Sequence, residues 1–215
     1  MPIVLPAEAS AATYWGTPGA GYANFGLDNT AKRLKTKDDG GSVLLYKTVI
    51  NNYSTTSQNM AAASRTYLTG SALTVPSTKL QIGTVLRWTF NMTKTSAGVA
   101  TSTFDIAFGT AGTTADTARV SFTKPAGTGV ADEAYCIIEA ICRGPLSASG
   151  IVVGEFVLMH NLAATGHAQI PIVCVNTVSS AFDVTVANLI AGICVTPGSS
   201  DSLTFQQVYA TCENL

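Results

Sequence analysis

Charged residues are scarce in this sequence. Asp, Glu, Lys and Arg together make up 12% of its 215 residues, and the net charge is -1 at pH 7. A protein that wraps nucleic acid needs a basic surface, so we expect no specific nucleic-acid partner. One basic cluster exists, and two aspartates directly after it offset its charge, which is typical of a solvated linker, with a genome-contacting arm as the alternative. The cluster comprises Lys32, Arg33, Lys35 and Lys37, followed by Asp38 and Asp39.

Residues of the kinds used in catalysis are also few. The two histidines, His160 and His167, lack the further ligands close in sequence that a metal site needs, so we expect one at a strand end and one in a surface loop. Asp132 and Glu133 are adjacent, and adjacent side chains of an extended chain point to opposite faces. Neither a G-x-S-x-G nucleophile elbow nor a Gly-Lys-Ser/Thr phosphate loop occurs. We therefore expect no enzyme activity and no cofactor.

Sequence signals for disulfides, export and membrane spanning are missing as well. The cysteines are odd in number and include no C-x-x-C pair, which argues against a disulfide framework or zinc site and predicts small buried side chains. The first six residues, MPIVLP, lack the cationic start of a signal peptide, and no apolar stretch is long enough to cross a bilayer. We expect synthesis in a cytoplasm and no membrane partner. The cysteines are Cys136, Cys142, Cys174, Cys194 and Cys212.

Residues 1–41 differ in character from the rest of the chain. They contain Gly and Pro at short intervals and no sustained hydrophobic period of 2 or 3.6, which predicts an extended N-terminal arm. Four aromatic side chains in this arm would make sense as contacts to another subunit that order on binding, and the alternative is that the arm wraps over its own domain. These candidate partner-binding residues are Tyr14, Trp15, Tyr22 and Phe25.

From residue 42 onward, short β-like segments alternate with turn signals. The clearest is residues 84–94, TVLRWTFNMTK, in which every second residue from Leu86 to Met92 is apolar. Residues 103–108 repeat the alternation, and the TSAG segment between the two predicts a hairpin. With no long helical pattern, these segments predict an all-β fold, an antiparallel β-sandwich that is jelly-roll-like, over residues 42–215. Further strands are expected at residues 42–50, 65–75, 118–124, 134–143, 150–160, 170–178, 181–190 and 203–212.

Two carboxylates lie within the expected strands. Glu139 interrupts the apolar run YCIIEAIC, so it either faces solvent between core residues or is buried against a cation such as Arg87 or Arg143. Asp105, in TFDIAF, is expected on the solvent face of its strand.

Residues 84–119 carry a resemblance to a known class of proteins. The segment TVLRWTFNMTKTSAGVATSTFDIAFGTAGTTADTAR resembles structural proteins of tailed phages, in which an RW-x-F strand leads into a KT-x-AG turn and then a GTAGTTADTAR loop. The later LAATG at residues 162–166 is similar to a segment of the same proteins, so that the likeness covers residues 65–210.

The resemblance implies a β-sandwich or jelly-roll module on a virion, trimeric in most cases, without enzyme activity or cofactor. We therefore expect a capsid decoration or cement protein on the capsid exterior, whose partners are the major capsid protein and further copies of this chain as a homotrimer. Proteins of this kind anchor through an extended terminus, which gives the arm that role here. No heptad stalk precedes the sandwich, which weakens a fibre interpretation.

Three alternatives remain open. A receptor-binding head of a tail fibre or spike predicts sugar-binding aromatics in the loops at residues 109–117 and 161–169, and those loops are poor in aromatics. A shell-forming coat protein is compatible with the fold, because viral coat proteins use jelly rolls. A glycan-cleaving enzyme needs two facing carboxylates, for which the sequence offers only Asp132, Glu133 and Glu139.

Overall fold

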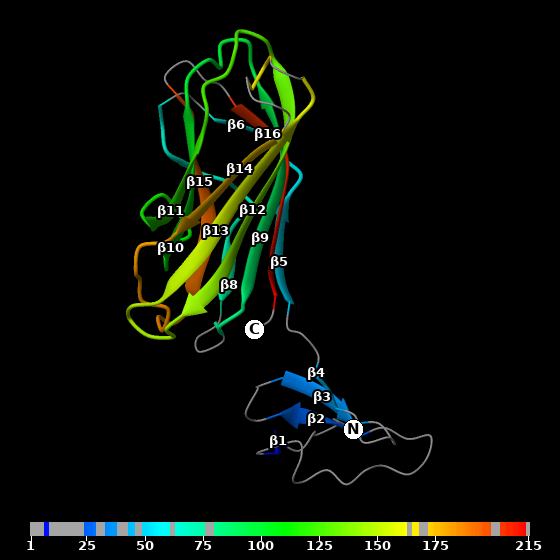
Figure 1. Cartoon of the computed structure of the whole chain (residues 1–215). Coiled ribbons are helices and arrows are strands. Elements are labelled where there is room, and N and C mark those ends of the chain that lie inside the picture. Colours follow the sequence, from blue (N-terminus) through cyan, green and yellow to red (C-terminus); the bar gives the residue numbers. More distant parts are fainter. Residues whose placement is uncertain are drawn as a thin grey trace. The chain divides into compact units, whose positions relative to one another are not determined.

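The computed structural model describes four short strands in residues 1–48 and most of the chain after them (Figure 1). The later described ranges are 49–60, 63–75, 80–162, 165–167, 172–198 and 203–213. The chain divides into two compact units, Met1–Thr48 and Val49–Leu215. All regular elements in the described ranges are strands. The same ranges contain no helix of the length and hydrophobicity needed to span a membrane.

The N-terminal unit contains a four-stranded sheet. Its strands are β1 (Ala7–Glu8), β2 (Asn24–Asp28), β3 (Arg33–Lys37) and β4 (Val43–Leu45), of which β1 and β2 are parallel and the others antiparallel. The segment expected as an extended arm thus includes short paired strands. The unit ends at Thr48, whereas the sequence predicts a boundary after residue 41. The single strand expected at residues 42–50 is divided between β4 and the first strand of the second unit.

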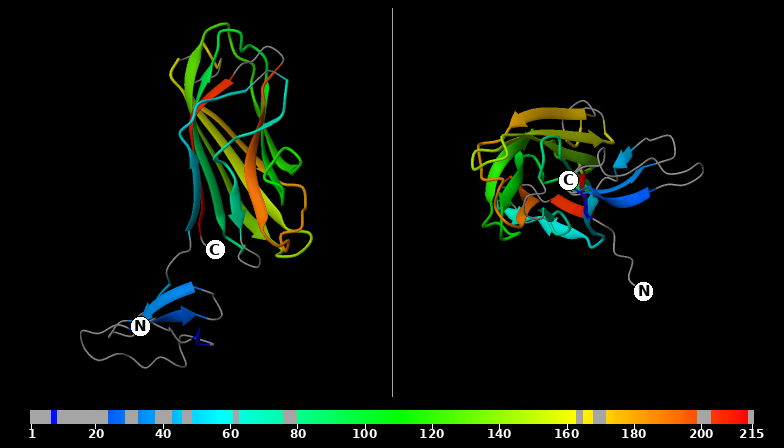
Figure 2. Two further views of the ribbon diagram at one scale, coloured as in Figure 1. Left: turned by 180° about the vertical axis from the view of Figure 1, so that it is seen from behind. Right: turned by 90° about the horizontal axis from the view of Figure 1, so that it is seen from below.

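The second unit is an antiparallel β-sandwich, as the sequence predicts (Figure 1 and Figure 2). One sheet has seven strands in the order β14-β13-β12-β9-β16-β5, with β6 also paired to β16. The other has five, in the order β11-β10-β15-β7, with β8 also paired to β15. Their bounds are β5 Val49–Ser54, β6 Gln58–Met60, β7 Thr66–Tyr67, β8 Leu73–Val75, β9 Val85–Lys94, β10 Ser102–Gly109, β11 Thr117–Lys124, β12 Asp132–Gly144, β13 Ile151–His160, β14 Ile172–Val178, β15 Leu189–Thr196 and β16 Leu203–Glu213.

The core lies between the two sheets and is built on aromatic side chains from both. Phe104 of β10 stacks on Phe156 of β13 with ring centroids 5.0 Å apart, and Phe90 meets Phe205 edge to face at 5.3 Å. Trp88 is fully buried, and its indole Nε1 donates a hydrogen bond to the Ser71 carbonyl oxygen at 2.7 Å. The described cysteines are free and buried, as predicted; they are Cys136, Cys142, Cys194 and Cys212.

Two of the sequence predictions about strands are wrong. The strands at residues 84–94 and 103–108 do not form a hairpin, because β9 pairs with β12 and β16 in one sheet while β10 pairs with β11 and β15 in the other. Both strands have an apolar face, and these faces meet across the core. The strand expected at residues 181–190 is absent, since Phe182 makes only an isolated bridge to Gly150 and the strand β15 begins at Leu189.

Candidate functional site

Three tyrosines lie on the outer face of the seven-stranded sheet. Tyr53 of β5 and Tyr209 of β16 are direct cross-strand partners, and Tyr135 lies on β12, separated from β16 by β9. Their exposed fractions are 68%, 47% and 40%. The neighbours of Tyr135 in sequence, Ala134 and Cys136, are buried, so the alternation of the strand directs the tyrosine outward. We call Tyr53, Tyr135 and Tyr209 the tyrosine face.

Three open depressions meet at Tyr135, which lines all of them. The first, of about 340 Å³, is lined mainly by amide, hydroxyl and carboxylate side chains, including Asn91, Asn161 and Gln206. The second, of about 250 Å³, lies between Tyr135 and the other two tyrosines and includes Gln207. The aromatic rings of the tyrosine face are thus bordered by amide side chains, which both donate and accept hydrogen bonds.

A charged pair borders the tyrosine face on the third depression. The Arg87 side chain donates from Nε to Oε2 of Glu139 at 2.7 Å, and the two residues are cross-strand partners on β9 and β12. Arg87 is 51% exposed, so the pair contributes at most about 1 kcal/mol to stability. The Glu139 side chain is 26% exposed on the outer face of the sheet, so it is not buried against a cation, and Arg87 is its partner there. Glu155 lies directly opposite Glu139 on β13.

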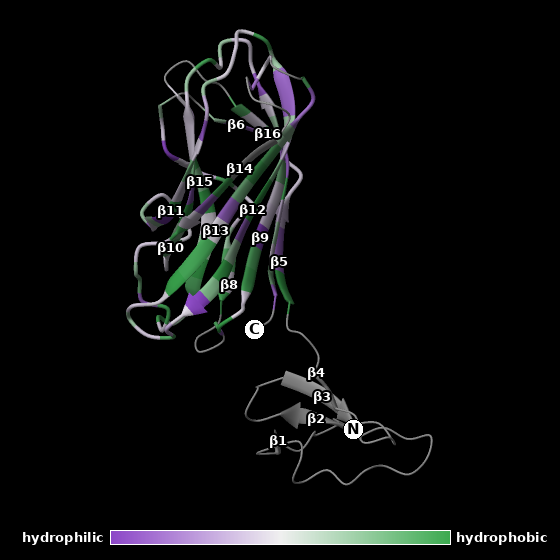
Figure 3. Ribbon diagram, viewed as in Figure 1, coloured by the Kyte–Doolittle hydropathy of each residue, from purple (hydrophilic) through white to green (hydrophobic). Residues whose placement is uncertain are grey.

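A row of aliphatic side chains crosses the same sheet face beyond this charged pair. Val85, Ile141, Val153 and Val178 are successive cross-strand partners on β9, β12, β13 and β14. We call these four residues the aliphatic row; Ile141 and Val178 in it are exposed. In Figure 3 the start of β13 is correspondingly hydrophobic. Val49 lies at the same end of the sheet, because it pairs with Glu213, which pairs with Val85.

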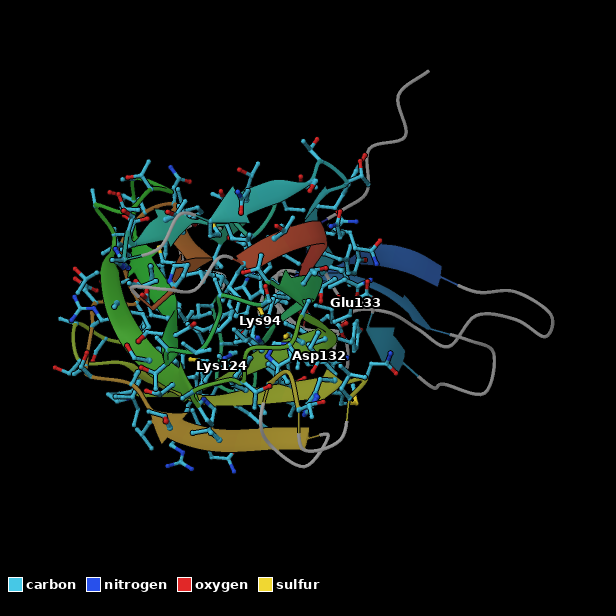
Figure 4. The ribbon with its side chains drawn as sticks, turned by 90° about the horizontal axis from the view of Figure 1, so that it is seen from above. Lys94, Lys124, Asp132 and Glu133 are labelled. Carbon is cyan, nitrogen blue, oxygen red and sulfur yellow. The ribbon has the colours of Figure 1, made fainter. Side chains whose placement is uncertain are left out.

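A cluster of buried polar side chains closes the opposite end of the sandwich. Figure 4 looks onto this end and labels three of its members, Lys94, Lys124 and Asp132. Lys94 and Asp132 are cross-strand partners at the ends of β9 and β12, and both lysines are fully buried. Lys94 Nζ donates to three carbonyl oxygens, those of Thr95, Thr128 and Val130, at 2.9, 2.9 and 2.8 Å. The lysine thus ties together the turns after β9 and β11.

The two histidines belong to this polar cluster. His160 Nδ1 lies 2.9 Å from Oδ2 of Asp132, and the same oxygen accepts the backbone N–H of His167 at 3.1 Å. His160 ends a strand, as predicted, but the expectation that His167 lies in a surface loop is wrong, since it is 1% exposed. Its segment turns at Gly166, where φ is 61° and a Cβ atom would stand 2.2 Å from Oδ2 of Asp132. Contact with Asp132 therefore buries the loop histidine.

Burial lowers the pKa of His167 to about 4, with a smaller contribution from the positive charge of Lys124, and Lys94 and His160 act in the same direction while Asp132 opposes them. Neither ring nitrogen of His167 has a hydrogen-bond partner among the described residues. A buried imidazole in this setting is neutral at pH 7. Among the residues that the structure describes, no three His, Cys, Asp or Glu side chains converge as metal ligands. The hydrogen bonds of Lys94 and Asp132 connect the turns at this end of the sandwich.

The buried His167 makes a prediction for acid stability. Its folded-state pKa lies below the unfolded value of about 6.5, so the unfolded chain binds a proton first as the pH falls, and stability is lost between pH 6.5 and 4. After allowance for local opening of the loop, we expect this loss to be about 2 kcal/mol. Urea unfolding at several pH values should show a shallower pH dependence for His167→Gln than for the unaltered chain. Parallel curves for the two proteins would contradict a neutral buried His167.

A second group of buried polar contacts holds the GTAGTTADTAR segment in place. Asp105 is buried, contrary to the prediction of a solvent-facing position. Its carboxylate accepts hydrogen bonds from Nε and Nη2 of Arg65, at 3.0 and 2.7 Å, and Arg65 covers it. Arg65 also donates to the carbonyl oxygens of Thr114 and Asp116, and the Asp116 carboxylate accepts the N–H groups of Ala111 and Gly112. The loop between β10 and β11 is thereby fixed to the outer side of the five-stranded sheet.

The candidate partner-binding residues of the N-terminal unit are placed only in part. Tyr14, Trp15 and Tyr22 lie outside the described residues, and Phe25 lies on β2, where the structure describes the backbone. Of the carboxylates available to a glycan-cleaving site, Asp132 is buried and Glu133 exposed, as their adjacency predicts. The sequence matches no protein-family model and no curated protein.

Proposed function

We propose that this chain is a structural protein of a tailed-phage particle, a capsid decoration protein that binds the shell and stabilises it. The observation that carries the proposal is the aliphatic row, which lies at the end of the sandwich where its first strand, β5, begins. A continuous row of exposed and half-buried apolar groups across four strands is typical of a surface that is covered by another protein. Low charge and the resemblance of residues 84–119 to phage structural proteins support the same role.

Such a protein acts through binding alone. The N-terminal unit, with Trp15 and its neighbouring aromatics, supplies one contact to the major capsid protein, and the aliphatic row supplies a second. Two linked contacts bind more tightly than either does alone, because the first raises the effective concentration of the second. Because only the assembled shell offers both contacts, binding stabilises the shell against opening. A homotrimer on the capsid exterior would multiply this effect.

Trp15→Ala is the variant that tests the N-terminal contact. A buried aromatic anchor is worth at least about 2 kcal/mol, so we expect retention on capsids to weaken about thirtyfold. The measurement is co-sedimentation of the purified full-length protein with capsids of the encoding phage that lack it. Thermal unfolding of the sandwich should be unchanged, because Trp15 belongs to the other unit.

Ile141→Glu tests the aliphatic row in the same assay, with exposed Val130→Glu at the opposite end as its matched control.

Capsid retention by Trp15→Ala at the level of the unaltered protein would overturn the anchoring role. Light scattering of the protein with and without residues 1–48 measures the oligomer, and a monomer would count against the trimer. A trimer that ignores capsids favours the second candidate, a receptor-binding head of a fibre or spike. The tyrosine face is the specific observation in favour of that second role, because it supplies the exposed aromatics that the loops lack.

A further inference from the structure

We propose that the tyrosine face binds a neutral oligosaccharide, on the virion surface or elsewhere. This inference goes beyond the capsid role and does not depend on it, since it uses the half of the sheet that lies away from the aliphatic row. The first support is the set of three exposed aromatic rings on one sheet face. A sugar ring packs its C–H groups on an aromatic ring, and tyrosine also offers a hydroxyl that remains hydrated.

The spacing of the tyrosines favours a chain of sugars over a single one. Tyr209 and Tyr135 are separated by one intervening strand, which corresponds to two interstrand steps, or about 10 Å across the sheet. They are also offset along the strands, because Tyr135 pairs with Asn91 and Tyr209 with Thr89. Tyr53 lies one further strand away on the other side of Tyr209. At this spacing the three rings offer stacking positions for more than one sugar. An oligosaccharide that runs across β12, β9, β16 and β5 can contact all three.

A β-bulge in β16 supplies the second, independent support. The register of β16 against β9 shifts between Phe205 and Gln207, and the two consecutive residues Gln206 and Gln207 are both exposed. A regular strand would turn one of them into the core, whereas a bulge re-aims a side chain, as is common beside binding sites. Gln206 lines the first depression and Gln207 lines the second. Both flank Tyr135.

The amide groups on this face match the chemistry of sugar hydroxyls. Gln207 and Asn91 are cross-strand partners, and Asn91 is in turn the partner of Tyr135, so two amides and a tyrosine lie in one row. Each amide donates through its NH₂ group and accepts through its oxygen, as a sugar hydroxyl does. Such rows discriminate between sugars through hydrogen bonds while the tyrosine rings supply contact area.

The charges around the face favour a neutral glycan. Glu133 lines the first depression, and Glu139 and Glu155 line the third. Arg87 is the only cation among the lining residues of the three depressions, and Glu139 already holds it. The excess of carboxylates repels sialic acids, uronic acids and nucleic-acid phosphates. A neutral polymer of hydroxyl or N-acetyl sugars meets no such repulsion.

The test is binding of the full-length protein to an immobilised panel of hexasaccharides. The neutral probes are hexamers of glucose, mannose, xylose and N-acetylglucosamine, and the acidic comparators are hexamers of sialic acid and of galacturonic acid. We expect at least one neutral probe to bind the unaltered protein. The affinity of Tyr135→Ala and of Gln207→Ala for that probe should be about tenfold lower. Tyr135→Phe keeps the aromatic ring and should retain most of the binding. Ile82→Ala, which removes an exposed side chain elsewhere, is the matched control and should bind normally.

Three results of the binding assay would overturn the inference. They are no binding to any neutral probe, binding that Tyr135→Ala leaves intact, and preference for the acidic comparators. A smaller oligomer for Tyr135→Ala than for the unaltered protein would instead assign the face to a subunit interface and would also overturn it. The capsid assay distinguishes failure of the glycan inference from failure of the proposed function. Tyr135→Ala should co-sediment with capsids like the unaltered protein, whether or not the tyrosine face binds a glycan.

Discussion

Replacement of Lys94 by methionine is expected to lower the free energy of unfolding of the sandwich by about 4 kcal/mol. The Lys94 side chain is fully buried, and its ammonium group donates to the carbonyl oxygens of Thr95, Thr128 and Val130. Methionine keeps the length and the apolar stem of lysine but offers no donor. Each carbonyl oxygen left without its partner costs about 1–3 kcal/mol unless the turn opens to water.

Chemical denaturation at pH 7, followed through the fluorescence of the buried Trp88, measures this loss. Arg87→Met is the matched control, because Arg87 lies on the same strand but faces outward and is half exposed in its pair with Glu139. The control should change the free energy of unfolding by less than about 1 kcal/mol. A loss for Lys94→Met as small as that of the control would show that the three carbonyl contacts contribute little.

Alternation made part of this fold predictable from sequence. β9, β12 and β13 each have one face in the core and one exposed, so the apolar and polar residues alternate along them, and the predicted strands match the observed bounds closely. β15 was missed because consecutive residues on both of its faces are buried, which leaves LIAGICVT without alternation. Alternation also cannot tell which sheet a strand joins, and this is why the β9–β10 hairpin was wrong.

The candidate site was predictable only where it is local in sequence. The outward position of Tyr135 follows from the run AYCIIEAICR, but its approach to Tyr53 and Tyr209 depends on the strand order β12-β9-β16-β5, which pairs residues far apart in the chain. The bulge at Gln206 leaves no sequence signal that we recognise. Asp132 and His160 likewise meet only because β12 and β13 pair antiparallel along their length. Long-range pairing therefore accounts for most of what the sequence leaves undetermined.

Asp105→Ala carries the second large effect, an expected loss of about 3 kcal/mol in the free energy of unfolding. The carboxylate is buried and holds the Arg65 guanidinium in a two-bond contact, and the same hydrogen bond raises the pKa of Arg65. In Asp105→Ala the partly buried Arg65 guanidinium loses its counterion. Arg65 also holds the loop between β10 and β11, so the loss should loosen that loop. Arg65 is 28% exposed, so water relieves part of the cost. Denaturation by urea measures the difference.

A double-mutant cycle separates the ion pair from the packing around it. Arg65→Met alone leaves the Asp105 carboxylate buried without its cation and should cost as much as Asp105→Ala. In the double variant no unpaired charge remains, so its loss should be smaller than the sum of the two single losses by about 2 kcal/mol. Strict additivity would mean that Arg65 and Asp105 act separately. It would then leave the hydrogen bonds of Asp116 to Ala111 and Gly112 as the main support of the loop.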